Sequence, residues 1–193
     1  MKRFAWMLVL GSLFATLGEY LFCVLVRHSV GDYLFTLAAY PILLALAWGP
    51  THWIERRLPT RLQADLAIYL LAGLAGLAIE WFVIGNSPWA NPEANDLGMF
   101  CYWATVLAMP RLLLDRRAHL RRVRSEAAIA SLLYAALALA IGHATPESLR
   151  LFVLVWTVVL GYAGTNLFFV CAFILEWRHG HEGAKLLRDG VGA

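Results

Sequence analysis

The sequence predicts an all-α polytopic integral membrane protein with six transmembrane helices and with both the N- and C-termini in the cytoplasm. Three observations predict this fold class. Of the 193 residues, 61% are hydrophobic and only 15% are charged, whereas a soluble domain is about half apolar and about a quarter charged. The apolar residues form long runs, as membrane spans require. Lysine and arginine gather in the connections of one side, which is typical of cytoplasmic loops.

Each apolar run is close to the ~20 residues that cross a ~30 Å hydrocarbon core as a helix. The runs lie roughly at residues 4–26, 33–54, 66–86, 97–114, 127–142 and 151–175. The first run follows Lys2 and Arg3 and resembles a signal peptide, but it continues to Val26 without a small-residue cleavage site. We therefore expect an uncleaved span. The connections are too short for a soluble domain, so residues 1–193 are expected to form a single transmembrane helical domain.

The basic residues indicate the orientation. With the N-terminus in the cytoplasm, all of the 16 lysine and arginine residues except Arg27 and Arg150 fall on the cytoplasmic side. This bias favours an even number of spans in the cell membrane, the inner membrane if the source is bacterial. Topology explains the basic balance, so nucleic acid is not an expected partner. Membrane lipids are expected partners, and the basic loop 115–126 could bind anionic head groups.

Metal and cofactor chemistry has little support in the sequence. Cys23, Cys101 and Cys171 all lie in apolar runs, which is typical of small buried side chains rather than disulfides or metal ligands. No histidine lies in the middle of a span, so a haem held by two helical histidines is not expected. The common metalloprotease, serine-hydrolase and phosphate-loop motifs do not occur. We expect no metal and no cofactor.

Two acidic residues, Glu19 and Glu80, lie inside apolar runs. Both belong to helices that run outward, and both lie roughly 10 Å below the outer end at 1.5 Å per residue. Their surroundings, "LGEYLF" and "AIEWFV", are alike, with an aromatic residue directly after the acid. A charge in hydrocarbon costs ~2.5–3.5 kcal/mol on insertion scales, so such residues indicate function by default. The structural alternative is a neutral glutamate that joins two helices by hydrogen bonds.

Small and polar residues share the faces that carry these acids. Ser12, Thr16 and Glu19 follow the spacing i, i+4, i+7, and Ala72, Gly76 and Glu80 follow i, i+4, i+8. Rows of small residues let helices approach closely, so both acids are expected to face other helices rather than lipid. A similar row on the sixth span contains Thr157, Gly161 and Thr165, with Asn166 beside it at a deeper level.

The longest outer connection, "GNSPWANPEAND", lies directly above Glu80 and is rich in turn-forming residues. Asn86, Glu93 and Asp96 could line an entrance there, and aromatic rings such as Trp81 could hold an apolar or cationic ligand through cation–π attraction. The predicted ligand- or proton-binding residues are Glu19, Glu80, Thr16, Asn86, Trp81 and Asp96.

Three hypotheses of function remain. The first is a binding or transport module with an outward-facing cavity, whose carboxyl groups handle a proton or a cationic or apolar small molecule. The second is a membrane-embedded enzyme that acts on an isoprenoid or lipid with a glutamate as general acid. The third is an accessory or assembly subunit, partnered by another membrane protein or by a second copy of the chain. Whether the protein is an enzyme stays open. We favour the first hypothesis because two acids at matched depth are costly to keep for packing alone.

Overall fold

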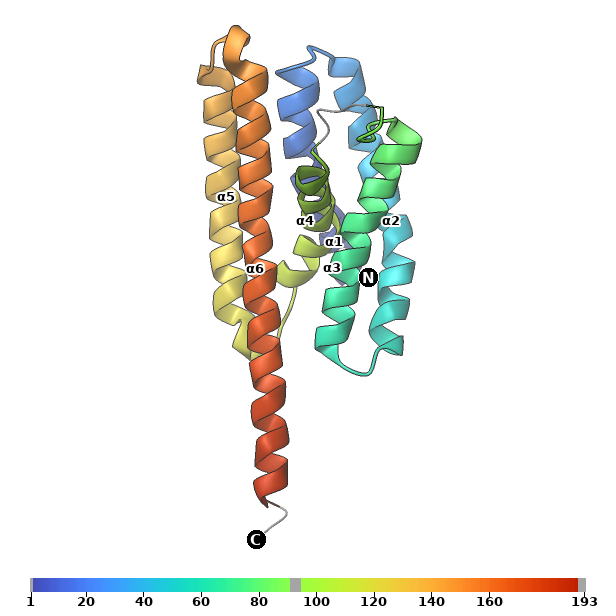
Figure 1. Cartoon of the computed structure of the whole chain (residues 1–193), viewed down its shortest axis with the longest axis vertical. Coiled ribbons are helices and arrows are strands. Elements are labelled where there is room, and N and C mark those ends of the chain that lie inside the picture. The colour runs from blue at the N-terminus through green and yellow to red at the C-terminus, as the bar shows by residue number, and fades with distance from the viewer. Residues whose placement is uncertain (1, 91–94, 191–193) are drawn as a thin grey trace.

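The computed structural model describes residues 2–90 and 95–190, with side chains described up to residue 181. The α-helices are α1 (Lys2–Glu19), α2 (Val30–Arg57), α3 (Arg61–Ile79), α4 (Asp96–Leu113), α5 (Arg121–Ala144) and α6 (Glu147–Gly190). In Figure 1, α5 and α6 run side by side on the left, α2 and α3 lie on the right, and α1 and α4 lie between them. The all-α prediction is confirmed.

Five helical segments are long and apolar enough to cross a membrane. They are Lys2–Val24, Val30–Arg57, Arg61–Ile84, Ala118–Ala144 and Glu147–His181. Large apolar side chains cover their outer faces, for example Phe35, which is 73% exposed, and Leu132, which is 72% exposed. Soluble monomers rarely expose apolar surface on this scale, so these five helices support a membrane protein. The fifth predicted run, 127–142, extends further than expected, because α5 begins at Arg121.

The central helix α4 departs from the sequence prediction. Its run was expected at 97–114 as one more span, but α4 is not among the five segments that qualify by length and composition. It contacts α1, α3, α5 and α6, and of its large apolar side chains only Leu97 is exposed. Because protein surrounds α4, polar residues such as Tyr102 and Arg111 find partners within the bundle. Polar residues such as these lower the mean hydropathy of α4.

Both helices that carry a buried glutamate change geometry at that residue. After Glu19, α1 continues as a π-helix, η1 (Tyr20–Val24), and after Ile79, α3 continues as a π-helix, η2 (Glu80–Ile84). Such turns are rare and frequently occur at functional sites. The second one ends at Gly85, whose φ of 80° suits glycine. The two similar segments, "LGEYLF" and "AIEWFV", therefore both change from α-helix to π-helix at or directly after the glutamate.

Glycines on α1 and α3 let the aromatic residues of α4 come close. A Cβ atom on Gly76 would lie 1.9 Å from Cγ of Trp103, and one on Gly18 would lie 2.8 Å from Cε2 of Tyr102. Gly18 and Gly76 are both buried. The prediction that rows of small residues form helix–helix contacts is confirmed at these positions. The contacts bring α4 directly against the two helices that carry Glu19 and Glu80.

Candidate functional site

Two consecutive residues of α4 contact the two glutamates, which are both partly buried. The hydroxyl of Tyr102 lies 3.2 Å from Oε1 of Glu19, and Nε1 of Trp103 donates to Oε1 of Glu80 at 3.1 Å. Consecutive residues of an α-helix point roughly 100° apart, so one of them reaches α1 and the other reaches α3. Both glutamates therefore face α4, and the prediction that they face other helices is confirmed.

Glu19 is surrounded by hydroxyl and thiol donors. The hydroxyl of Tyr40, on α2, donates to Oε1 at 2.6 Å, and the thiol of Cys23 lies 3.4 Å from Oε2. The Tyr102 hydroxyl is also 2.7 Å from the Tyr40 hydroxyl and 3.2 Å from the carbonyl oxygen of Ala15. One hydroxyl carries one proton, so Tyr102 donates to one of these acceptors at a time. Three helices thus meet at this carboxyl group.

Glu80 has two nitrogen donors. Besides Trp103, the side-chain amide of Asn86 donates to its Oε2 at 3.4 Å, and the backbone N–H of Asn86 donates to its carbonyl oxygen at 2.8 Å. The same Asn86 amide lies 3.3 Å from the sulfur of Met99. The turn that follows η2 therefore folds back over the Glu80 carboxyl group and contacts the first turn of α4.

The surroundings of the two acids touch through aromatic rings. The centroid of the Tyr40 ring lies 5.7 Å from that of Trp103, and the centroid of Tyr102 lies 5.8 Å from it. Tyr40 binds Glu19, and Trp103 binds Glu80. We call this cluster the acid–aromatic layer, and its members are Glu19, Glu80, Tyr40, Tyr102, Trp103 and Asn86.

Neither acid has a basic partner among the side chains that the structure describes. No lysine, arginine or histidine nitrogen of those residues lies within 4.0 Å of the carboxylate oxygens of Glu19 or Glu80. The described hydrogen-bond donors to both carboxyl groups are neutral. A carboxylate in an apolar span is costly to keep charged. These two groups therefore lack the ion pair that would hold a carboxylate permanently charged.

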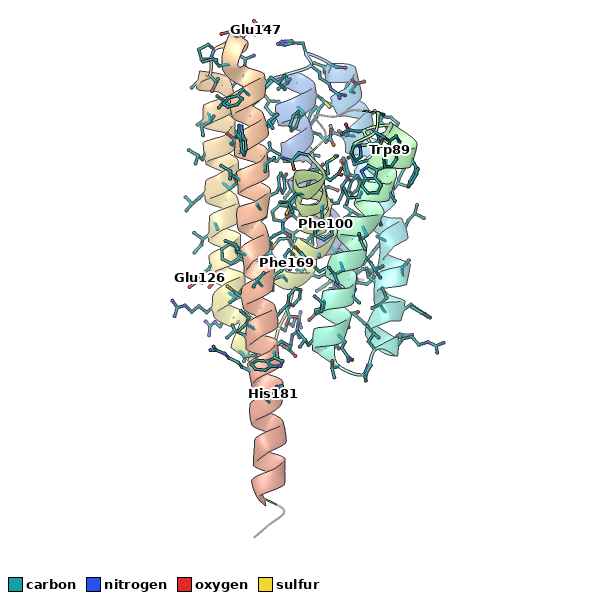
Figure 2. All side chains as sticks on the ribbon, in the orientation of Figure 1. Trp89, Phe100, Glu126, Glu147, Phe169 and His181 are labelled. Carbon is teal, nitrogen blue, oxygen red and sulfur yellow. The ribbon has the colours of Figure 1, made fainter. Side chains whose placement is uncertain are left out.

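The other predicted site residues lie nearby but make different contacts. Nε1 of Trp81 donates to Oδ1 of Asp96 at 3.0 Å, which joins η2 to the first turn of α4. The Thr16 hydroxyl donates to the carbonyl oxygen of Leu13 at 3.3 Å rather than to Glu19. Glu93 lies outside the described residues. Figure 2 shows Trp89 toward the end of the bundle opposite His181. The Trp89 ring packs against Trp81 with centroids 5.4 Å apart.

Sequence reasoning missed the most direct partner of Glu19. Tyr40 lies in the middle of α2, and its only signal is a hydroxyl-bearing ring inside an apolar run. Tyr102 and Trp103 attract attention as aromatic residues of the outer third, a position that interfacial aromatic belts also explain. Their role as partners of Glu19 and Glu80 follows only from the position of α4 between α1 and α3.

A second polar contact joins α4 to α6. The side-chain amide of Asn166 donates to the carbonyl oxygen of Cys101 and to the Thr105 hydroxyl, each at 3.0 Å. The hydroxyls of Thr105 and Thr165 are 3.1 Å apart. Thr157 of the predicted row donates to the carbonyl oxygen of Val153 within α6. Asn166 thus contacts α4, and none of its hydrogen bonds reaches Glu19 or Glu80.

Among the described residues, no group of three or more histidine, cysteine, aspartate or glutamate side chains is arranged to hold a metal ion. The chain matches no family model, no curated protein and no solved structure. Function therefore has to be inferred from the chemistry of the side chains themselves.

Proposed function

We propose that the protein is a multi-pass protein of the cell membrane that binds or transports a small molecule, with Glu19 and Glu80 taking up a proton or a cationic group. The supporting observation is that both carboxyl groups lie in candidate spans and, within the part of the chain whose side chains are described, accept hydrogen bonds from neutral donors only. A carboxyl group paired with arginine would stay ionised, whereas these two are free to gain or lose a proton. Intramembrane acids with this freedom serve as proton relays.

The same proposal includes six crossings with both termini in the cytoplasm. Five helices are apolar enough to cross a membrane, and α4, which packs against α1, α3, α5 and α6, makes the sixth crossing. The connections 58–60 and 114–120 lie at one end of the bundle, which we call the basic end because Arg56, Arg57, Arg116 and Arg117 flank or occupy them. The positive-inside rule places this end in the cytoplasm. Reporters that are active only in the cytoplasm should work at both termini, and a silent reporter at either terminus would contradict this topology.

Infrared spectroscopy tests the carboxyl chemistry directly. A protonated carboxyl group in the reconstituted protein has a C=O stretching band that ionised carboxylates lack. We expect Glu19→Gln and Glu80→Gln each to remove part of this band, and the band of the unmodified protein to change as pH is varied. Glu126→Gln is the matched control, because Glu126 is an exposed residue of α5 that pairs with Arg122. If both buried variants leave the band as it is in the control, the proposed protonation change does not occur.

Proteoliposomes test transport. A potassium diffusion potential set with valinomycin drives protons inward, and a trapped pH-sensitive dye reports their flux. We expect flux in the unmodified protein and in Glu126→Gln, and none in Glu80→Gln, which should still elute as a folded protein. Equal flux in all three would show that Glu80 carries no proton.

Glutamine variants of the two glutamates, together with copurification, test the two alternative functions. A membrane enzyme acting on an isoprenoid or lipid would use the glutamate as general acid, so Glu80→Gln would abolish turnover and leave substrate binding intact. An accessory subunit would copurify with a fixed membrane partner in mild detergent, and both glutamine variants would stay functional. We favour the binding or transport module because the two glutamates together join four helices, α1 to α4, and yet lack cationic partners among the described side chains.

A further inference from the structure

A cavity of about 780 Å³ lies at the basic end of the bundle. It is lined by the starts of α1 and α3, the ends of α2 and α4, the connection 114–117 and α6. Figure 1 shows that α4 ends above the lower ends of α3 and α5. Neither Glu19 nor Glu80 lines this cavity. Its size falls within the range of small-molecule sites, roughly 300–1,000 Å³.

Every acidic side chain that lines the cavity is already paired with a cation. Glu55 of α2 contacts Arg111 of α4 at 2.5 Å. Arg117 contacts Asp65 at 2.6 Å, Asp115 at 2.6 Å and Glu176 at 2.9 Å. His119 also contacts Glu176, at 2.6 Å. The negative charge of the wall is therefore committed to partners within the protein.

Three basic side chains of the wall have no such partner. Lys2, Arg3 and Arg116 are exposed residues that line the cavity, and within the part of the chain whose side chains are described they form no ion pair or hydrogen bond. Their charge is available to a ligand. Guanidinium groups bind phosphate and carboxylate oxygens in two-pronged geometry, so the free charge of this wall favours an anion.

An apolar groove lies on the outer surface beside this cavity. Leu62 and Leu66 of α3 and Phe173, Ile174 and Trp177 of α6 line a groove of about 280 Å³. Phe173 also lines the cavity, so the two spaces adjoin. Leu66 and Trp177 are exposed on the outer face that the bundle presents to lipid. Figure 2 places Phe169, another apolar residue of the cavity wall, about level with the lower end of α4.

We propose that the cavity at the basic end binds a lipid with an anionic, phosphate-bearing head group. The head group lies among Lys2, Arg3 and Arg116, and the acyl chain passes through the α3–α6 groove into the bilayer. The paired arginines, Arg111 and Arg117, shape the wall and leave the three unpaired cations facing the ligand. This site does not involve Glu19 or Glu80, so it stands apart from the proposed proton chemistry.

Native mass spectrometry of the full chain in mild detergent tests the proposal, with dioleoyl phosphatidic acid as the probe. Arg3→Gln and Arg116→Gln should each lower the apparent affinity about tenfold, which is the loss of one charge-assisted contact. Arg121→Gln is the matched control, since Arg121 is an exposed residue of the same basic segment that does not line the cavity. Both test residues are exposed, so their substitution should leave the fold intact, and the thermal midpoint checks this.

A second pair of variants tests whether the acyl chain occupies the groove. Leu66→Trp should block the acyl path and weaken phosphatidic acid binding, whereas Leu70→Trp, at an exposed position of the same helix outside the groove, should not. Dioleoyl phosphatidylcholine, with the same chains, and glycerol 3-phosphate, the head group alone, should both bind at least tenfold more weakly.

Three results would overturn the proposal. Equal losses in Arg116→Gln and Arg121→Gln would show that lipid binds by general surface charge. Glycerol 3-phosphate binding as tightly as the lipid would show a site for free phosphate. Phosphatidylcholine binding as tightly as phosphatidic acid would show that the unpaired cations do not select the head group.

Discussion

The two ends of this bundle hold their acidic side chains in opposite ways. In the acid–aromatic layer, tyrosine, tryptophan and asparagine donate to Glu19 and Glu80. At the basic end, Glu55 and Glu176 contact Arg111 and Arg117. Hydrogen bonds from neutral donors favour the charged form of a carboxyl group, but an arginine adds a full positive charge beside it and favours that form more strongly. The first region therefore holds its carboxyl groups by hydrogen bonds alone, and the second provides a charged framework around a cavity.

The comparison predicts its largest effect at Arg117, which contacts three acids at once. Arg117→Gln removes the shared cation from partly buried carboxylates, and breaking such a pair costs several kcal/mol. We expect the free energy of unfolding in mild detergent to fall by about 3 kcal/mol. Arg122→Gln, which breaks an exposed pair with Glu126, should change it little. Similar losses in the two variants would mean that the Arg117 cluster contributes no more than a surface pair.

A smaller effect is expected where α3 meets α4. In Gly76→Ala the new methyl group would lie 1.9 Å from Cγ of Trp103, so the indole must move away from Glu80. Overpacking of this kind costs about 2 kcal/mol, which a thermal unfolding series would detect. Gly164→Ala, with no atom within 4 Å of its added Cβ, should be neutral or gain up to about 1 kcal/mol from helix propensity. A stable Gly76→Ala protein would show that Trp103 is not held against the glycine.

The acid–aromatic layer itself should respond to loss of one hydroxyl. Tyr40→Phe removes the donor that lies 2.6 Å from Glu19. The expected loss of stability is about 1 kcal/mol if the carboxyl group is neutral and about 2 kcal/mol if it is charged. Tyr33→Phe, on the same helix and with no described hydrogen bond to its hydroxyl, is the control. The size of the effect thus distinguishes a neutral from a charged Glu19 carboxyl group.

The sequence predicts the helices well where the bilayer alone determines composition. Five apolar runs correspond to five helices that are long and apolar enough to cross a membrane, because such a helix must be continuously hydrophobic. The central helix α4 deviates because its neighbours satisfy its polar residues. The π-turns at Glu19 and Glu80 were not predicted, since one extra residue in a turn leaves no mark on hydropathy.

The candidate sites, too, are predicted from the sequence only as far as local spacing determines them. The row Ala72, Gly76, Glu80 indicates correctly that Glu80 faces another helix, because that inference needs only helical spacing. The partners of Glu19 and the cavity at the basic end depend on tertiary packing. Arg111 is 56 residues from Glu55, and Arg117 is 52 residues from Asp65. No local pattern relates residues at such distances along the chain.

The smallest expected effect is the acid response of Asp115, in the connection between α4 and η3. Burial alone would raise the pKa of this carboxyl group, but hydrogen bonds from the side chain and backbone of Arg117 hold the pKa below its ordinary value of 3.8. A carboxylate with a lowered folded-state pKa contributes stability above its ordinary value and loses that contribution as pH falls through the lower folded value. The thermal midpoint of the unmodified protein should therefore exceed that of Asp115→Asn by a constant amount above about pH 5, and the difference should shrink only in stronger acid. Burial alone would lower the pKa of Arg117, but its hydrogen bonds to Asp115 and Asp65 and their negative charges raise that pKa, so Arg117 stays charged throughout. A difference that persists unchanged through the acid range would mean that the charge on Asp115 does not contribute to the framework.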